Sequence, residues 1–317
     1  MNIVLLESLA ISDNKLNKFR QKLEKRGHQF TAYDKRVETD KKIIKRAEDA
    51  DVIILTNLAI SANVINSLPR LKMISVAFTG VDHVDLNACK ENDIIVANAP
   101  GYSTNSVAEL AIGLMVNVMR NVNKCDRALR NNKTRDGLIG NEIYGKTLGI
   151  IGTGSIGLRV AEIAKAFGCN LIAYSKSEVE KAKKLGINYV SIEELFEKSD
   201  IISLHVPHTP ETEGMIDSSL INRMKKSAIF INTARGPIVD SEALAAALND
   251  KRIAGAGVDV FDMEPPIPEE HPLVNAKNTV LTPHVAFATP EAFEKRADIV
   301  FNNIFSWEKG NLSNQII

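Results

Sequence analysis

The feature that most constrains the fold is a set of three closely spaced glycines between a short apolar run and a helical pattern. In "LGIIGTGSIGLRVAEIAKAFG", residues 148–168, Gly152, Gly154 and Gly157 form the pattern G-x-G-x-x-G. A strand before these glycines and a helix after them are the context in which this pattern binds a dinucleotide. Gly152 permits a tight turn, Gly154 lets the backbone approach a pyrophosphate, and Gly157 lets the helix pack closely on the sheet.

Short apolar runs alternate with amphipathic stretches along the whole chain. A first series contains "NIVLL", "DVIILT", "LKMISVAF" and "DIIVANAP", and a second contains "TLGII", "LIAY", "IISLHV", "AIFINT", "GAGVDV" and "TVLTPH". Strands that alternate with helices form parallel sheets. The chain of 317 residues also exceeds the usual size of one domain. We therefore expect an α/β protein with two doubly wound, Rossmann-like parallel sheets.

The boundary between the two series is expected near Pro100 and Gly101, which interrupt the chain before a long helical pattern. The segment "TPEAFEKRADIVFNNIFSWEKG" follows the last predicted strand and has no further strand to pair with. We expect it to pack back on the first domain. The predicted division is 1–100 with 286–317 for one domain and 101–285 for the dinucleotide-binding domain.

Composition argues against several kinds of partner. Lysine plus arginine equals aspartate plus glutamate at 39 each, so no net charge attracts nucleic acid or an anionic membrane. The longest apolar stretch, "LAIGLMVNVM", is too short to span a bilayer, and the chain starts without the basic leader of a signal peptide. Cys89, Cys125 and Cys169 are scattered, without metal or redox spacing. These observations predict a cytoplasmic protein that binds a small molecule and no metal.

Three chemically reactive side chains follow predicted strands of the second series. Arg235 lies in "INTARGPIVD", Glu264 in "GVDVFDMEPP" and His284 in "LTPHVAFAT". Ligands of open α/β sheets bind at the carboxyl ends of the strands, so we expect these side chains to converge. An imidazole beside a carboxylate suits proton transfer, and a guanidinium can hold a substrate carboxylate while it polarises a carbonyl.

With these residues, the sequence resembles the family of D-isomer-specific 2-hydroxyacid dehydrogenases over essentially its whole length. The motifs "GVDHVDL", "GYSTNSVAELAIGLM", "LHVPHTPET", "NTARGPIVD", "DVFDMEP" and "TPHVA" lie in the family's order. The resemblance implies a flavodoxin-like substrate domain and a Rossmann domain, with the active site in the cleft between them. It implies hydride transfer between NAD(P)(H) and a small D-2-hydroxy or 2-oxo acid.

The resemblance also assigns roles to individual residues. Arg235, Glu264 and His284 would be catalytic, and the backbone N–H groups of Thr79 and Gly80 would hold the substrate carboxylate together with Arg235. The positions that would line the cofactor are Thr104, Gly152, Gly154, Ser155, Ile156, Gly157, His205, Val206, Pro207, Thr233, Ala234, Asp259 and His284. The resemblance favours a homodimer, for which the apolar segment "VAELAIGLMVNVM" would supply surface; the same segment would also suit a core helix.

The strand after the glycines ends in "LIAYSKSE", where Ser175 stands in place of the acid that usually binds the adenosine ribose. Ser175 does not repel a 2′-phosphate, and Lys176 can attract one. Glu178 and Glu180 lie nearby and would oppose Lys176 if they turned toward the pocket. The stretch favours NADP(H) and leaves NAD(H) open.

Departures from relatives narrow the substrate. Val76 stands where phosphoglycerate dehydrogenases commonly carry an arginine. Glu264 stands where formate dehydrogenases have a residue with an amide side chain. These differences favour hydroxypyruvate, glyoxylate or pyruvate, without deciding among them. Two alternatives remain: a phosphoglycerate dehydrogenase that lacks a regulatory domain, and a dinucleotide-sensing scaffold similar to a transcriptional corepressor.

Overall fold

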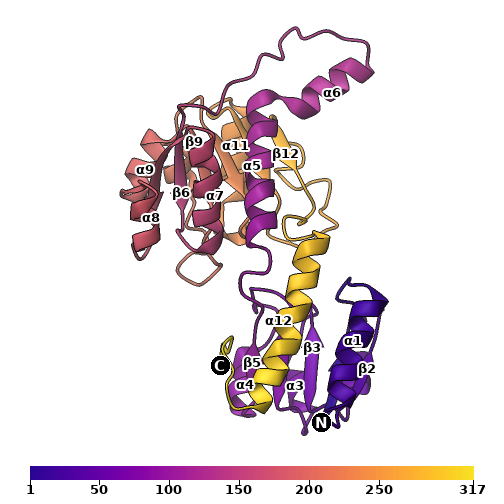
Figure 1. Cartoon of the computed structure of the whole chain (residues 1–317). Coiled ribbons are helices and arrows are strands. Elements are labelled where there is room, and N and C mark those ends of the chain that lie inside the picture. The colour runs from indigo at the N-terminus through magenta and orange to yellow at the C-terminus, as the bar shows by residue number, and fades with distance from the viewer. The chain divides into compact units, whose positions relative to one another are not determined.

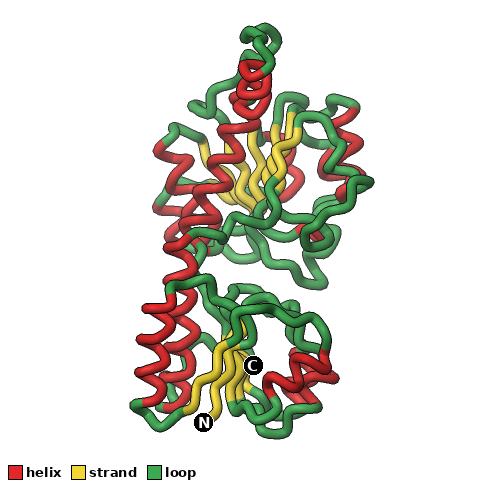
Figure 2. The backbone as a smooth tube through the Cα atoms, turned by 90° about the vertical axis from the view of Figure 1, so that its right-hand side faces the viewer, coloured by secondary structure: helices red, strands yellow, loops and turns green.

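The computed structural model describes residues 1–317 and divides the chain into two compact units. The first unit contains Met1–Ser103 and Ala288–Ile317, and the second contains Thr104–Phe287. In each unit, parallel strands lie between helices (Figure 2). The predicted fold class, with two doubly wound parallel sheets, is therefore confirmed.

The first unit has a five-stranded sheet in the order β2-β1-β3-β4-β5, the flavodoxin-like order. Its strands are β1 (Asn2–Leu5), β2 (Gln29–Ala32), β3 (Val52–Leu55), β4 (Met73–Val76) and β5 (Ile95–Ala97). Its helices are α1 (Asp13–Glu24), α2 (Asp40–Ala47), α3 (Ala62–Asn66), α4 (Leu86–Glu91) and α12 (Pro290–Glu308).

The C-terminal segment is built into this first unit. Helix α12 begins after the N-cap Thr289 and packs against β4, where Ser75 Oγ donates to Val300 O at 3.1 Å (Figure 1). After α12, an antiparallel bridge between Ala97 and Gln315 places the last residues on the edge strand β5. The chain end thus covers a strand edge that would otherwise be open.

The second unit has a seven-stranded sheet in the order β12-β11-β10-β9-β6-β7-β8. Its strands are β6 (Thr147–Ile151), β7 (Asn170–Tyr174), β8 (Asn188–Tyr189), β9 (Ile201–Leu204), β10 (Ile229–Asn232), β11 (Gly255–Val258) and β12 (Thr279–Leu281). Its helices are α5 (Thr104–Arg120), α6 (Val122–Arg130), α7 (Ser155–Ala166), α8 (Glu180–Lys184), α9 (Ile192–Lys198), α10 (Ser218–Ile221), α11 (Ser241–Asn249) and the 3₁₀ turn η1 (Gly236–Ile238). The strand order reverses between β6 and β9, the position where such sheets bind ligands.

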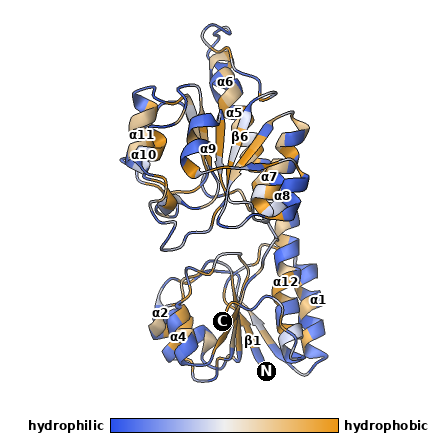
Figure 3. Cartoon of the chain, turned by 90° about the vertical axis from the view of Figure 1, so that its left-hand side faces the viewer, coloured by the Kyte–Doolittle hydropathy of each residue, from blue (hydrophilic) through white to orange (hydrophobic).

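The core of the second unit explains the hydrophobic pattern of the sequence. Strands β9, β10 and β11 are buried along their whole length, and Figure 3 shows hydrophobic residues along the strands of this unit and hydrophilic residues on α8. Helix α5 packs on α7, β10 and β11. The absence of a side chain at Gly257 allows this close approach. A Cβ at that position would lie only 2.8 Å from Leu114 Cβ. The apolar face of "VAELAIGLMVNVM" is thus used within the core.

Helix α6 and the segment after it stand away from the sheet of the second unit (Figures 1 and 2). No residue of α6 is buried. Leu129 is 77% exposed and Ile139 is 90% exposed, unusually high values for large apolar side chains. No helix of the chain has the length and apolarity that a membrane crossing requires.

Candidate active site

The glycine-rich turn joins β6 to α7 with very little space around it. Gly152 has φ +97°, and its N–H donates to Tyr174 O at 2.8 Å. A Cβ at Gly152 would lie 2.7 Å from His205 O, and one at Gly157 would lie 2.0 Å from Gly152 O. Gly152 therefore lets the turn lie against the end of β9, and Gly157 lets α7 pack closely on the turn and on β6.

The surroundings of Gly154 are open, in contrast to those of its neighbours. A Cβ at Gly154 would meet no atom within 4 Å, and no side chain caps the start of α7. The first N–H groups of the helix, from Ser155, Ile156 and Gly157, can therefore bind an anion. Thr233 follows β10, which lies two strands from β6 in the sheet. Its buried Oγ1 has no hydrogen-bond partner within the chain. These groups fit a phosphate-bearing cofactor.

The adenosine end of this site is expected after β7, where Ser175 is partly buried and Lys176 is exposed. Glu178, which would oppose Lys176, instead forms an ion pair with Lys183 at 2.8 Å. A different acid lies within electrostatic reach of Lys176. The pKa of Glu211 is lowered by a hydrogen bond from Thr209, with a smaller contribution from Lys176.

The remaining cofactor positions follow neighbouring strands or begin α5. His205, Val206 and Pro207 come directly after β9, Ala234 follows β10, and Thr104 is the first residue of α5. His205 Nε2 lies 2.8 Å from Ser203 Oγ, and burial lowers the pKa of His205 to about 3. His205 is therefore a neutral imidazole at physiological pH.

His284 and Glu264 form a direct pair in the second unit. His284 Nδ1 lies 2.9 Å from both Oε1 and Oε2 of Glu264. A carboxylate accepts hydrogen bonds, so Nδ1 carries the proton of this bond and Nε2 is the nitrogen that remains for a ligand. The ring of Phe287 meets the imidazole edge-on at 5.4 Å between centroids, which restricts its rotation.

The backbone at His284 is held in an unusual conformation by Asp259. His284 has φ +55°, which is uncommon for a residue with a side chain. Its N–H donates to Asp259 O at 2.8 Å. The Asp259 carboxylate accepts from Thr282 Oγ1 at 2.5 Å and from Val285 N and Ala286 N at 2.9 Å each. Burial raises the pKa of Asp259, and these three hydrogen bonds oppose the rise.

Arg235 lies directly after β10, in a turn fixed by Asn232. Asn232 Oδ1 accepts from Ala234 N at 2.9 Å, and Asn232 Nδ2 donates to Arg235 O at 3.1 Å. Asn232 is buried, so both bonds are shielded from water. The backbone on which the guanidinium sits is therefore rigid, as a substrate clamp requires.

Gly236 brings the Arg235 turn against the segment that leads to Glu264. A Cβ at Gly236 would lie 1.8 Å from the carbonyl carbon of Phe261 and 2.4 Å from Asp262 N. No other residue fits here without moving one of the two segments. The motif "NTARGPIVD" contains this glycine, but the contact with Phe261 was not part of the prediction from the sequence.

A second pair, also absent from that prediction, holds the segment after Glu264. His271 Nε2 lies 2.8 Å from Asp262 Oδ1, and Leu273 N donates to His271 Nδ1 at 3.2 Å. Because Nδ1 accepts, Nε2 carries the proton and donates to Asp262. The bond closes the segment between Asp262 and His271 into a loop and thereby limits the positions open to Glu264.

Thr79 and Gly80, the expected substrate-carboxylate residues, belong to the first unit, where they follow β4. The other expected site residues all belong to the second unit, Thr104–Phe287. Within that unit, His284 forms hydrogen bonds with both Glu264 and Asp259. The turn that carries Arg235 lies against the segment leading to Glu264, through the close approach of Gly236 to Phe261.

A doubly wound sheet with an open glycine turn, together with a histidine–carboxylate pair at strand ends, defines the class of dinucleotide-dependent dehydrogenases. Comparison with known proteins identifies the family. Residues 112–286 match the family model described as "D-isomer specific 2-hydroxyacid dehydrogenase, NAD binding domain".

Relatives are similar over most of their length. A glyoxylate reductase from Korarchaeum cryptofilum is 39% identical over 87% of this chain and 85% of that protein. A hydroxypyruvate reductase from Blautia hydrogenotrophica is 34% identical over 100% of this chain and 99% of that protein. The structure of an acyclic imino acid reductase in complex with NADPH and D-Arg has a TM-score of 0.90 and 33% identity, covering 100% of both chains.

The chain belongs to the D-isomer specific 2-hydroxyacid dehydrogenase family. It is an oxidoreductase that uses a nicotinamide cofactor and acts on the CH–OH group of a small 2-hydroxy acid or on the corresponding 2-oxo acid. The family, fold class and enzyme class predicted from the sequence are thus confirmed.

Proposed function

We propose that this protein reduces a small 2-oxo acid of the glyoxylate or hydroxypyruvate class, with His284 as the proton donor. The observation that carries the proposal is the pair between His284 Nδ1 and both oxygens of Glu264, at 2.9 Å. The names of the two relatives, glyoxylate reductase and hydroxypyruvate reductase, support this substrate class.

The chain's own residues divide the chemistry between them. The Glu264 carboxylate stabilises the imidazolium, and the proton leaves from Nε2 to the substrate oxygen during reduction. Arg235 binds the substrate carboxylate and polarises the carbonyl, with the N–H groups of Thr79 and Gly80 as further donors. Asp259 holds the backbone of His284. A nicotinamide cofactor, when bound, supplies the hydride.

The residues that would hold this cofactor lie along the ends of β6, β7, β9 and β10. The N–H groups of Ser155 and Ile156 would face the pyrophosphate, and Thr233 Oγ1 is a buried hydroxyl still lacking a hydrogen-bond partner. Beyond the nicotinamide class, we propose a preference for NADPH. The ion pair between Glu178 and Lys183 at 2.8 Å supports that preference, because it balances the charge of one acid that follows Lys176 in the sequence.

We also propose that the first unit binds the substrate and that the second binds the cofactor, as the match of residues 112–286 to an NAD-binding model suggests. A homodimer and a cytoplasmic location complete the proposal. The free thiols of Cys89, Cys125 and Cys169 support that location, because cytosolic cysteines are kept reduced.

The proposed function is tested by steady-state reduction of glyoxylate, hydroxypyruvate, pyruvate and 3-phosphohydroxypyruvate, with NADH and with NADPH. We expect kcat/KM to be highest for glyoxylate or hydroxypyruvate. His284→Ala should lower kcat by about 10²–10⁴-fold while the cofactor dissociation constant stays unchanged. A preference for the phosphorylated acid would assign the chain to phosphoglycerate dehydrogenation, and no turnover with any acid would favour a sensing scaffold.

A further inference from the structure

The backbone at Thr79 and Gly80 is bonded to the segment that follows β5. Asn98 Nδ2 donates to Thr79 O at 2.7 Å. Next to this bond, Ala99 N donates to Phe78 O at 2.9 Å and Thr79 Oγ1 donates to Ala99 O at 3.3 Å. The pairing of β4 with β5 therefore continues beyond the strands, into the loop expected to hold the substrate carboxylate.

The bond from Asn98 fixes the direction of the Gly80 N–H. The Thr79–Gly80 peptide is trans, because the only cis bond of the chain is Pro265–Pro266. In a trans peptide the C=O and the following N–H point in opposite directions within one plane. The Thr79 carbonyl points toward Asn98, so the Gly80 N–H points away from it. No hydrogen bond from this N–H to another group of the chain is present.

Asn98 is itself held by two further asparagines of the first unit. Its O accepts from Asn303 Nδ2 at 2.9 Å, and its N–H donates to Asn314 O at 3.1 Å. Asn314 Nδ2 in turn donates to Asn303 Oδ1 at 2.8 Å. Asn303 comes from α12 and Asn314 from the segment after it, so the C-terminal part of the chain meets the segment after β5 at Asn98.

This network lies in a buried environment, where hydrogen bonds orient their partners firmly. Asn98 is 8% exposed and Asn303 is 2% exposed. Breaking one bond of such a network leaves a buried polar group without a partner. These bonds fix the backbone of Asn98, and from that fixed backbone its side-chain amide donates to the Thr79 carbonyl.

We propose that Asn98 is a positioning residue for substrate binding, because it turns the Thr79–Gly80 peptide so that the Gly80 N–H is presented to the substrate carboxylate. Asn303 and Asn314 secure Asn98 in this orientation. The inference rests on the proposed function, in which this loop holds the carboxylate of a 2-oxo acid.

The test is Asn98→Leu, a substitution of similar size that removes the donor to Thr79 O. We expect the KM for glyoxylate and the inhibition constant of oxamate, a non-reacting 2-oxo acid analogue, to rise about tenfold, the equivalent of one hydrogen bond. The dissociation constant of NADPH and the pH profile of kcat should stay unchanged. Weaker binding of glyoxylate and oxamate with unchanged binding of NADPH would distinguish a misoriented carboxylate loop from a general loss of structure.

The matched control is Asn92→Ala. Asn92 follows α4 of the first unit, and its Nδ2 donates to Asn66 Oδ1 and Ala88 O at 2.8 and 2.9 Å, but it does not contact the Thr79 loop. Its oxamate affinity should equal that of the wild type. If Asn98→Leu does not fold, as judged by circular dichroism, Asn98→Asp keeps the size and replaces the donor with an acceptor, and the same rise is expected at pH 8.

The outcomes separate the two proposals. If the wild-type chain reduces 2-oxo acids and the folded Asn98 variant binds oxamate within twofold of the wild type, the positioning role is wrong and the proposed function stands. An equal loss of oxamate and NADPH affinity would also overturn the role. If the wild-type chain reduces no 2-oxo acid, the proposed function fails and the role of Asn98 fails with it.

Discussion

His284 Nδ1 lies 2.9 Å from each carboxylate oxygen of Glu264, so a single proton is shared with both oxygens. The side chain of Glu264 is 65% exposed while that of His284 is 16% exposed. The carboxylate therefore acts from the solvent side of a largely buried imidazole. In this geometry Glu264 is expected to hold the imidazole and stabilise its positive charge without taking part in hydride transfer.

The first prediction concerns Glu264→Gln, which retains an oxygen that can accept from Nδ1 but removes the negative charge. The protonated imidazole loses the charge that stabilises it, so kcat/KM for reduction should fall about tenfold. The magnitude is small because solvent screens an exposed carboxylate. The measurement is kcat/KM for glyoxylate from pH 5 to 9. Glu269→Gln, an exposed carboxylate of the same loop, is the control, and superimposable profiles for Glu264→Gln and wild type would rule out the role.

The second prediction concerns Gly236→Ala. The added Cβ would lie 1.8 Å from the backbone of Phe261, so either the Arg235 turn or the segment that leads to Glu264 must move. A displacement of about 1 Å between catalytic groups can cost about 100-fold in rate, and we expect a loss of that size in kcat/KM. Thermal unfolding should also occur at lower temperature.

Gly113→Ala provides the matched control for that substitution. Gly113 lies on α5, and a Cβ there would meet no atom within 4 Å. Alanine favours the helix by about 1 kcal/mol, so the control should unfold at a slightly higher temperature and keep full activity. Full activity of Gly236→Ala would show that the close contact with Phe261 is not needed.

The parts of the molecule that the sequence predicts well depend on local patterns. The glycines of the turn at Gly152 are read directly from their spacing between a strand and a helix. Arg235, Glu264 and His284 are predicted as site residues because each follows an apolar run, and strand ends meet at one edge of a parallel sheet. The structure places Glu264 and His284 in contact, as this reasoning requires.

The features that the sequence does not predict depend on hydrogen bonds between segments that are far apart along the chain. The bond from Asn98 to Thr79 joins two strand ends, and its support by Asn303 and Asn314 comes from the other end of the chain. The left-handed backbone of His284 likewise depends on hydrogen bonds to Asp259. No periodicity in the sequence encodes such bonds, because an isolated asparagine or aspartate has the same local signature in a solvated loop.

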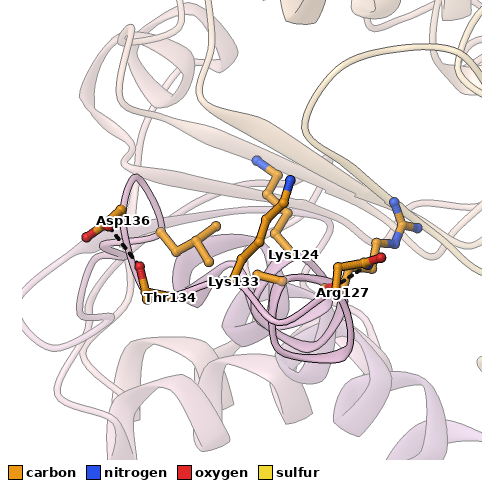
Figure 4. A pocket seen from close by; sticks show the side chains of 8 residues that line it. Lys124, Arg127, Lys133, Thr134 and Asp136 are labelled. Atoms are coloured by element: carbon orange, nitrogen blue, oxygen red, sulfur yellow. Dashed lines mark hydrogen bonds between the residues drawn. The ribbon is translucent and has the colours of Figure 1, made fainter.

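The surface through which two copies of the chain could associate is another feature that the sequence pattern does not locate. The apolar segment of α5 suggested surplus surface, yet its residues pack within the second unit. The two most exposed large apolar side chains lie instead on α6 and in the segment after it, at Leu129 and Ile139. Figure 4 shows a hollow on α6 and the segment after it, whose lining includes Lys124, Arg127, Lys133, Thr134 and Asp136. Large apolar side chains exposed to this degree are a feature of surfaces that bind another protein.

The third prediction is that the protein is a homodimer that associates through this surface. Light scattering at micromolar concentration should give twice the mass of one chain. Leu129→Glu combined with Ile139→Glu should give a single-chain mass, because burying two carboxylates without partners opposes association. Lys18→Glu, an exposed charge of the first unit, should remain dimeric. A wild-type protein with the mass of one chain would contradict the prediction.

The fourth prediction is that NADPH is preferred over NADH, and it rests on the residues after β7. Ser175 stands where a carboxylate would repel a 2′-phosphate, and the exposed Lys176 can offer a positive charge. Glu178 is engaged by Lys183 at 2.8 Å, which removes one opposing charge. Glu211 still lies within electrostatic reach of Lys176, so the lysine acts at less than full strength.

The balance of these charges determines the expected ratio of kcat/KM with NADPH to kcat/KM with NADH. In the wild type, kcat/KM should be higher with NADPH than with NADH, by a factor that falls as salt is added, because an exposed lysine is screened. Ser175→Asp places a carboxylate beside the 2′-phosphate and should shift the ratio toward NADH by about 10- to 100-fold, the equivalent of one repulsive charge contact. Lys184→Ala, an exposed lysine of α8, should leave the ratio unchanged. A wild-type enzyme that already favours NADH tenfold would mean that Ser175 and Lys176 do not select the cofactor.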